Sequence, residues 1–194
     1  MIGVLVSVLI LSVAVISAFW PKYEERFFEL GLLGKNKKAE EYYPNNNSTL
    51  QLGSSVLWHI YLHNHMGSIQ NVSVRVKLLN STMQAPDDRK HEPSPFPNFM
   101  EFPVSLSVDE TLLIPVSWSV VEASSQEGNV TISGLSVNNQ TFNMSVLSSN
   151  RFRMVFELWV YDQSSQQYKF GWDSGKGFYS ASLYMWFSLT PPGE

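Results

Sequence analysis

The chain has 194 residues, and its formal net charge is −4 with only 15% charged residues. This acidic balance, without a basic stripe in any segment, argues against a nucleic-acid partner, because such proteins concentrate lysine and arginine on one face. The absence of cysteine excludes a disulfide scaffold, a thiolate metal site and a thiol nucleophile.

The first segment, residues 2–20, contains no charged residue and ends at Pro21. A helix of this length spans roughly 28 Å, close to the hydrocarbon thickness of a bilayer. The sequence therefore predicts one transmembrane anchor over residues 1–21, in contact with membrane lipid. A cleaved signal peptide is the alternative, because Ser17 and Ala18 suit a cleavage site, although no basic region precedes the apolar run.

Two signals for the orientation of this anchor oppose each other. Lys22 and Arg26 follow the apolar segment and favour a cytoplasmic C-terminal side by the positive-inside rule. N-glycosylation sequons, which mark exposed segments of secreted proteins, are more frequent than chance predicts and favour the opposite orientation. We therefore expect a single-pass cell-membrane protein whose residues 22–194 form one extracytoplasmic domain with N-linked glycans. The candidate acceptors are Asn46, Asn47, Asn71, Asn80, Asn129, Asn139 and Asn143.

Alternating apolar and polar residues predict strands in the first half of the domain. A short strand over residues 26–34 ends at a glycine, and a polar loop with Pro44 follows it. Residues 56–63 and 72–79 alternate clearly and are separated by a turn, so we interpret them as a hairpin. The expected core face of the first of these strands carries Val56, Trp58, Ile60 and Leu62.

Residues 80–98 contain four prolines and read as a long surface excursion rather than an element. The strands expected after this loop span residues 99–106, 111–120, 129–137, 140–146, 152–160, 168–172 and 179–189. Pro115 suggests an edge position, and no segment after Pro21 has helical periodicity. The sequence therefore predicts an all-β fold, an immunoglobulin-like antiparallel β-sandwich preceded by one transmembrane helix.

Several short segments occur in the order found in a known family. They are RFFELGLLG, KKAEEYYP, NHMG, SVDETLLIPVSW, RFRMVFELWVYD and YKF, spread over residues 26–172. In these the chain resembles the extracytoplasmic domain of archaeal membrane proteins grouped as domain of unknown function 1616. The resemblance implies an archaeal cell-surface setting and an immunoglobulin-like fold, with no catalytic residues to transfer. Members of that family carry several transmembrane helices, whereas this chain has one apolar segment.

Histidines provide the best candidates for metal ligands, but their spacing is poor. His59 and His63 lie about 13 Å apart on an extended strand and cannot share an ion. His63 and His65 could share one only if the strand continued through the predicted turn, so we expect His59 and His63 to face solvent and His65 to lie in a turn. The sequence predicts no metal, no cofactor and no catalytic residue, and we expect no enzyme.

An aromatic surplus remains on the faces opposite the expected core: Trp159, Tyr161, Trp172, Tyr184 and Trp186. Loops and the excursion of residues 80–98 could cover these side chains, or they could form a docking surface for a partner or the membrane interface. The leading hypothesis is a non-catalytic accessory or structural subunit that binds other membrane or envelope proteins. The alternatives are a carbohydrate-binding surface module and a pilin-like filament subunit, although Pro21 interrupts the long helix that a pilin needs.

Overall fold

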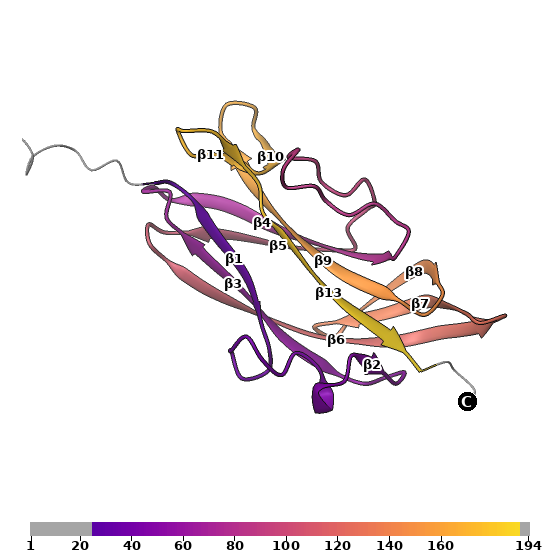
Figure 1. The fold of residues 1–194 in the computed structure, drawn as a ribbon. Coiled ribbons are helices and arrows are strands. Elements are labelled where there is room, and N and C mark those ends of the chain that lie inside the picture. The colour runs from indigo at the N-terminus through magenta and orange to yellow at the C-terminus, as the bar shows by residue number, and fades with distance from the viewer. Residues whose placement is uncertain (1–24, 191–194) are drawn as a thin grey trace, which may run out of the picture.

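The computed structural model describes residues 25–190, which form two β-sheets packed face to face (Figure 1). The predicted all-β sandwich is therefore confirmed. The expected anchor over residues 1–21 lies outside the described residues. Within residues 25–190, no helix has the length and apolar character required to cross a membrane.

The first sheet has five strands in the order β1-β3-β6-β7-β8, and neighbouring strands are antiparallel. These strands are β1 (Phe28–Leu33), β3 (Val56–Asn64), β6 (Thr111–Gln126), β7 (Asn129–Val137) and β8 (Gln140–Ser148).

The second sheet has the order β2-β13-β9-β4-β5, with β10 paired to β9, and only the short β2–β13 pair is parallel. A separate two-stranded pair, β11 with β12, lies beside it, and a 3₁₀ turn, η1, follows the first loop. The bounds are β2 (Thr49–Leu50), η1 (Pro44–Asn46), β4 (Gln70–Asn80), β5 (Met100–Leu106), β9 (Phe152–Asp162), β10 (Gln167–Phe170), β11 (Trp172–Asp173), β12 (Phe178–Tyr179) and β13 (Ser182–Leu189).

The strand order has the immunoglobulin arrangement. Strands β1, β3 and β6 take the places of A, B and E in one sheet, and β4, β9 and β13 take those of C, F and G in the other. The β7–β8 hairpin extends the first sheet beyond β6. The chain crosses between the sheets after β1 and β2, because the short β2 belongs to the second sheet, and again after β3, after β5 and after β8.

The predicted hairpin of residues 56–63 and 72–79 is wrong, because β3 and β4 belong to different sheets. The buried side chain of Asn64 stabilises this crossing. Its Nδ2 donates to the carbonyl oxygens of Leu106 and Ser107, at 3.2 and 2.8 Å, where the chain crosses back from β5 to β6. A local alternation predicts a strand, but it carries no information about which strand pairs with it.

Aromatic side chains fill the centre of the space between the sheets. The rings of Trp58 and Trp118 lie 4.9 Å apart, Phe156 approaches Trp58 at 6.0 Å, and Phe187 approaches Trp118 at 5.0 Å. Burying each side chain of this size contributes about 1.5–3 kcal/mol to folding. The predicted core face of β3 is confirmed, since each of its members is at most 1% exposed: Val56, Trp58, Ile60 and Leu62.

Pro115 lies in the part of β6 that pairs with β3 alone, since β7 joins β6 only from Trp118 onward. A proline nitrogen has no hydrogen to donate, so at an open strand edge no hydrogen bond to a neighbouring strand is lost. At that edge Asn138 replaces a neighbouring strand: its Nδ2 donates to Pro115 O and its Oδ1 accepts from Ser117 N, at 3.1 and 2.9 Å. The predicted edge position is wrong for β6 as a whole, which lies between β3 and β7, but the part of β6 before Trp118 has an open edge.

The long loop of residues 81–98 packs against the outer face of the second sheet. Arg153 on β9 donates to the carbonyl oxygen of Met83, and Oδ2 of Asp88 accepts from the amide and hydroxyl of Ser182 at 3.1 and 3.0 Å. Val155, on the outer face of β9, is fully buried. The loop therefore covers part of the second face of these strands, which was one explanation for their two-sided hydrophobic character.

Candidate functional site

Two aromatic side chains on β13 lie next to two arginines on the outer face of the second sheet. Tyr184 is 47% exposed, and its ring lies 6.0 Å from that of the half-buried Trp186. The guanidinium of Arg153 lies 5.0 Å from the Trp186 ring and 5.6 Å from the Tyr184 ring, and that of Arg151 lies 4.7 Å from Trp186. We call Tyr184, Trp186, Arg151 and Arg153 the aromatic–arginine patch.

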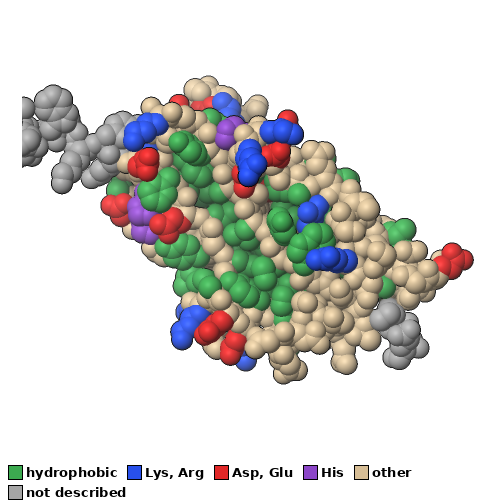
Figure 2. Space-filling model, viewed as in Figure 1, with side chains coloured by type: hydrophobic (Ala, Val, Ile, Leu, Met, Phe, Trp, Pro, Cys, Tyr) green, Lys and Arg blue, Asp and Glu red, His purple; other side chains and the backbone are tan. Residues whose placement is uncertain are grey.

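The strand register builds this patch. Trp186 on β13 lies directly opposite Arg153 on β9, and Tyr184 lies two residues away on the same face. Figure 2 shows basic side chains directly beside hydrophobic ones on the face that carries β13. The sequence pattern identified the two aromatic residues, but not the arginines that belong with them.

The arginines of the patch have no carboxylate partner within 4 Å among residues 25–190. Each guanidinium lies over an aromatic ring instead. Partial burial lowers the pKa of the Arg153 guanidinium, but a guanidinium remains charged at neutral pH. Its Nε is buried and has no hydrogen-bond partner in the part of the chain that the structure describes. The patch thus combines apolar area with uncompensated positive charge, a combination that favours carboxylates carried on an apolar partner.

The other predicted surface aromatics lie elsewhere. Trp159 is half-buried, with the guanidinium of Arg75 lying 3.8 Å above its ring. Tyr161 packs edge-on against Tyr168 of β10 at 5.3 Å. The expectation that Trp172 joins an exposed surface is wrong, because it is only 7% exposed and packs against Phe28 of β1.

The predicted glycan acceptors differ in exposure. Those with exposed side chains are Asn46, Asn47, Asn71, Asn139 and Asn143. Asn129 is half-buried at the start of β7. Asn80 is half-buried too, and its side chain is engaged: Nδ2 donates to Leu147 O at 2.7 Å, and Oδ1 accepts from the amides of Thr82 and Met83.

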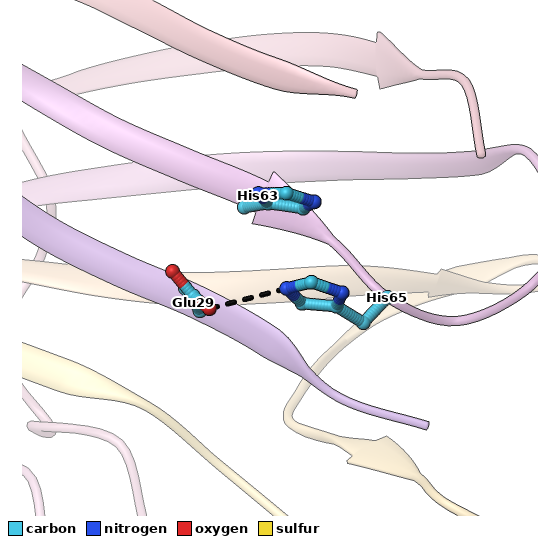
Figure 3. Close-up of side chains that lie close together, drawn as sticks. All are labelled: Glu29, His63 and His65. Carbon is cyan, nitrogen blue, oxygen red and sulfur yellow. Dashed lines mark hydrogen bonds and ion pairs between the residues drawn. The ribbon is translucent and has the colours of Figure 1, made fainter. Parts of the chain in front are cut away.

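A second group of polar side chains lies at the end of the domain where β1 begins, and we call Glu29, His63 and His65 the histidine–glutamate cluster. Their candidate ligand atoms all lie within 4.8 Å of one another. His65 Nε2 is 3.1 Å from Glu29 Oε1, and the two imidazole rings stack with centroids 3.9 Å apart (Figure 3). Figure 2 shows histidine and acidic side chains together at this end of the molecule.

The fold places these three residues together for local reasons. Because Asn64 points into the protein, its neighbours His63 and His65 project to the same outer side. Glu29 on β1 lies directly opposite His63 on β3 in the antiparallel register. His65 therefore lies just beyond the end of β3, as the sequence predicts, yet still close enough to stack on His63.

Further side chains orient the cluster. Tyr61 OH donates to Glu29 Oε2 at 3.0 Å, and this bond together with that from His65 lowers the pKa of the Glu29 carboxyl. Thr111 Oγ1 lies 3.0 Å from His63 Nδ1, whereas His63 Nε2 is buried and has no hydrogen-bond partner among the described residues. Glu29 is therefore held as a carboxylate, and one nitrogen of His63 is left unused.

The expectation that His59 faces solvent is wrong, because its side chain is only 7% exposed. The chain leaving β1 covers it, and its Nδ1 lies 3.1 Å from the carbonyl oxygen of Gly34. Gly34 is required here, since a Cβ at this position would lie 1.9 Å from the carbonyl oxygen of Glu40.

No known protein-family pattern matches the chain, and no curated protein is similar to it in sequence. The resemblance to domain of unknown function 1616 therefore stays a prediction.

Solved structures similar to this chain include a CARDB domain from the archaeon Pyrococcus furiosus, crystallised in complex with di-metal ions, at 10% identity and a TM-score of 0.39 over 88% of this chain and 98% of that one. A solution structure of the same domain gives 10% identity and a TM-score of 0.41 over 86% of this chain and 96% of that one. A β-glucosidase involved in saponin metabolism from intestinal bacteria gives 11% identity and a TM-score of 0.43 over 85% of this chain and 16% of that one. Likenesses at this level carry no inference about function.

Proposed function

We propose that the chain is a membrane-anchored, N-glycosylated extracytoplasmic module without catalytic activity, and that it binds another envelope protein through the aromatic–arginine patch. The apolar run of residues 2–20 supports the anchor, and the excess of sequons supports the outer location. The observation that carries the docking role is the exposed Tyr184 ring beside Trp186 and two arginines that have no carboxylate partner among residues 25–190.

The composition of the patch supports a protein partner. Tryptophan, tyrosine and arginine are the residues most enriched among those that dominate binding energy at protein interfaces. The positive charge of Arg151 and Arg153 favours a partner segment rich in aspartate and glutamate. A carbohydrate ligand is the second candidate, favoured by the exposed aromatic ring of Tyr184, but a neutral sugar leaves both guanidinium charges without a counterpart.

The test is a contact map made in the native membrane. p-Benzoylphenylalanine replaces Tyr184 in the full-length chain, the cells are irradiated, and the attached peptide is identified by mass spectrometry. We expect one protein to be captured through an acidic segment, and less capture at raised salt concentration. The same probe in place of Tyr179, which is also 47% exposed but lies outside the patch, controls for exposure alone.

Three outcomes contradict the proposal. Equal capture from both positions means that the patch has no special role. No capture from position 184, with the chain extracted alone in mild detergent, overturns the docking function. Binding on a glycan array that disappears in Tyr184→Ala but not in Tyr179→Ala selects the carbohydrate alternative instead.

A further inference from the structure

The histidine–glutamate cluster has the donor set of a transition-metal site. Two imidazoles and one carboxylate suit Zn²⁺ and its neighbours in the first transition row, whereas Ca²⁺ and Mg²⁺ prefer oxygen ligands alone. In zinc sites with three protein ligands, water takes the fourth position. Glu29 is exposed, and His63 and His65 are half-buried, so the cluster lies at the surface of the domain.

The distances between the donor atoms are close to those around a bound ion. Ligand bonds of about 2.0–2.1 Å in a tetrahedron put neighbouring donors roughly 3.3 Å apart. Glu29 Oε1 and His65 Nε2 are already 3.1 Å apart, and one ring nitrogen of His63 completes a set of candidate ligand atoms within 4.8 Å of one another. Side-chain rotation alone can therefore bring the third donor into place.

The unused nitrogen of His63 is the second observation that points to a ligand. His63 Nε2 is buried and unpartnered among the described residues, while Nδ1 lies 3.0 Å from the Thr111 hydroxyl. If Nδ1–H donates to Thr111 Oγ1, then Nε2 carries the lone pair that a metal requires. Tyr61 OH plays the matching role for the carboxylate, because it donates to Glu29 Oε2 and leaves Oε1 available.

We propose that Glu29, His63 and His65 bind one divalent transition-metal ion at the end of the domain where β1 begins, with Zn²⁺ as its representative. The two rings are stacked with an interplanar angle of 10°, so their lone pairs run nearly parallel. Binding requires the His63 ring to tilt out of this stack until both nitrogens face the ion. The proposal rests on residues remote from the aromatic–arginine patch and is independent of the docking function.

The experiment titrates Zn²⁺ into the metal-free full-length chain in mild detergent at neutral pH, followed by calorimetry. We expect one ion per chain and no competition from Mg²⁺ or Ca²⁺. His63→Gln and His65→Gln each remove a ligand while keeping a polar side chain of similar length, and we expect each to weaken binding at least about tenfold. Thr111→Val, which removes only the hydroxyl beside Nδ1, is expected to weaken binding about tenfold as well.

His91→Gln is the matched control, because His91 contacts Ser180 and Phe178 outside the cluster. It is expected to bind Zn²⁺ as the unchanged protein does. Circular dichroism identifies any variant that fails to fold, and the imidazole ¹⁵N spectrum of the unchanged protein provides a readout without mutation, with Zn²⁺ expected to shift Nε2 of His63. Binding well below one ion per chain, equal binding by all variants, or an unshifted Nε2 signal overturns the proposal.

Discussion

The ammonium nitrogen of Lys77 lies 2.9 Å from Oε2 of Glu157, and both side chains are buried on the outer face of the second sheet. The loop of residues 81–98 covers this pair through Ser94: its amide donates to Glu157 Oε1 at 2.8 Å, and its carbonyl oxygen accepts from Lys77 at 2.6 Å. Trp159 Nε1 donates to the other carboxylate oxygen at 3.0 Å. The ion pair therefore holds a proline-rich loop in one place.

We expect Lys77→Met to destabilise the domain by about 3–5 kcal/mol, because it leaves the Glu157 carboxylate buried without its cation. The double variant Lys77→Met with Glu157→Leu removes both charges, and we expect it to be more stable than the single variant. Chemical denaturation measures both. A loss below about 1 kcal/mol in the single variant, the range of an exposed pair, contradicts the buried position of this interaction.

A second prediction concerns two glycines, Gly31 within β1 and Gly34 just after it. A Cβ on Gly34 would lie 1.9 Å from a backbone oxygen, so Gly34→Ala is expected to cost about 1–3 kcal/mol of stability. Gly31 is the control, since a Cβ there lies 3.5 Å from Tyr61, an ordinary contact. Gly31→Ala is expected to stabilise by about 0.5–1 kcal/mol, because alanine has less backbone freedom to lose. Similar unfolding midpoints for the two variants contradict this expectation.

The strands could be predicted from the sequence because burial of one face imposes a period of two, as in the buried alternation from Val56 to Leu62. Which strands pair with one another could not be predicted in the same way. The turn after His63 predicts a reversal, but the local pattern does not say to which sheet the chain returns. Asn64 at this crossing bonds Leu106 and Ser107, which lie more than forty residues away in the sequence.

The candidate sites, too, could be predicted from the sequence only in part. Periodicity identified Tyr184 and Trp186 on an outer face, but their arginine neighbours come from the β9–β13 register. Glu29 comes next to His63 only through the β1–β3 register, which neither strand encodes by itself. His59 points outward as its position predicts, and it is buried because the chain at Gly34 folds over it.

A third prediction is the response to acid of the turn between β9 and β10. The ion pair with Lys169, and hydrogen bonds from Ser164 and Ser165, hold the pKa of Asp162 below its usual range. A pKa lower in the folded than in the unfolded state gives stability that is present above the ordinary value of about 3.9 and is lost as the pH falls through the lowered value.

We therefore expect the Asp162→Asn variant to lose less stability than the unchanged protein as the pH falls from about 5 to about 2. Lys169→Met removes the largest cause of the shift, so the Asp162 carboxyl should titrate at higher pH in an NMR titration. Denaturation midpoints across this range measure the first effect. Parallel curves for the unchanged protein and Asp162→Asn contradict it.

The last prediction concerns which sequons carry glycans. Asn139 lies in the exposed β7–β8 turn, and Asn143 lies on β8 at the edge of its sheet, so a glycan on either projects into solvent. Asn80 differs, because its Nδ2 donates to Leu147 O at 2.7 Å and a glycan on that nitrogen would displace the contact. Glycopeptide mapping of protein from native membranes is expected to find Asn139 and Asn143 occupied and Asn80 bare. Occupied Asn80 with unchanged thermal stability contradicts the prediction, since it means that the Leu147 contact does not restrict the amide.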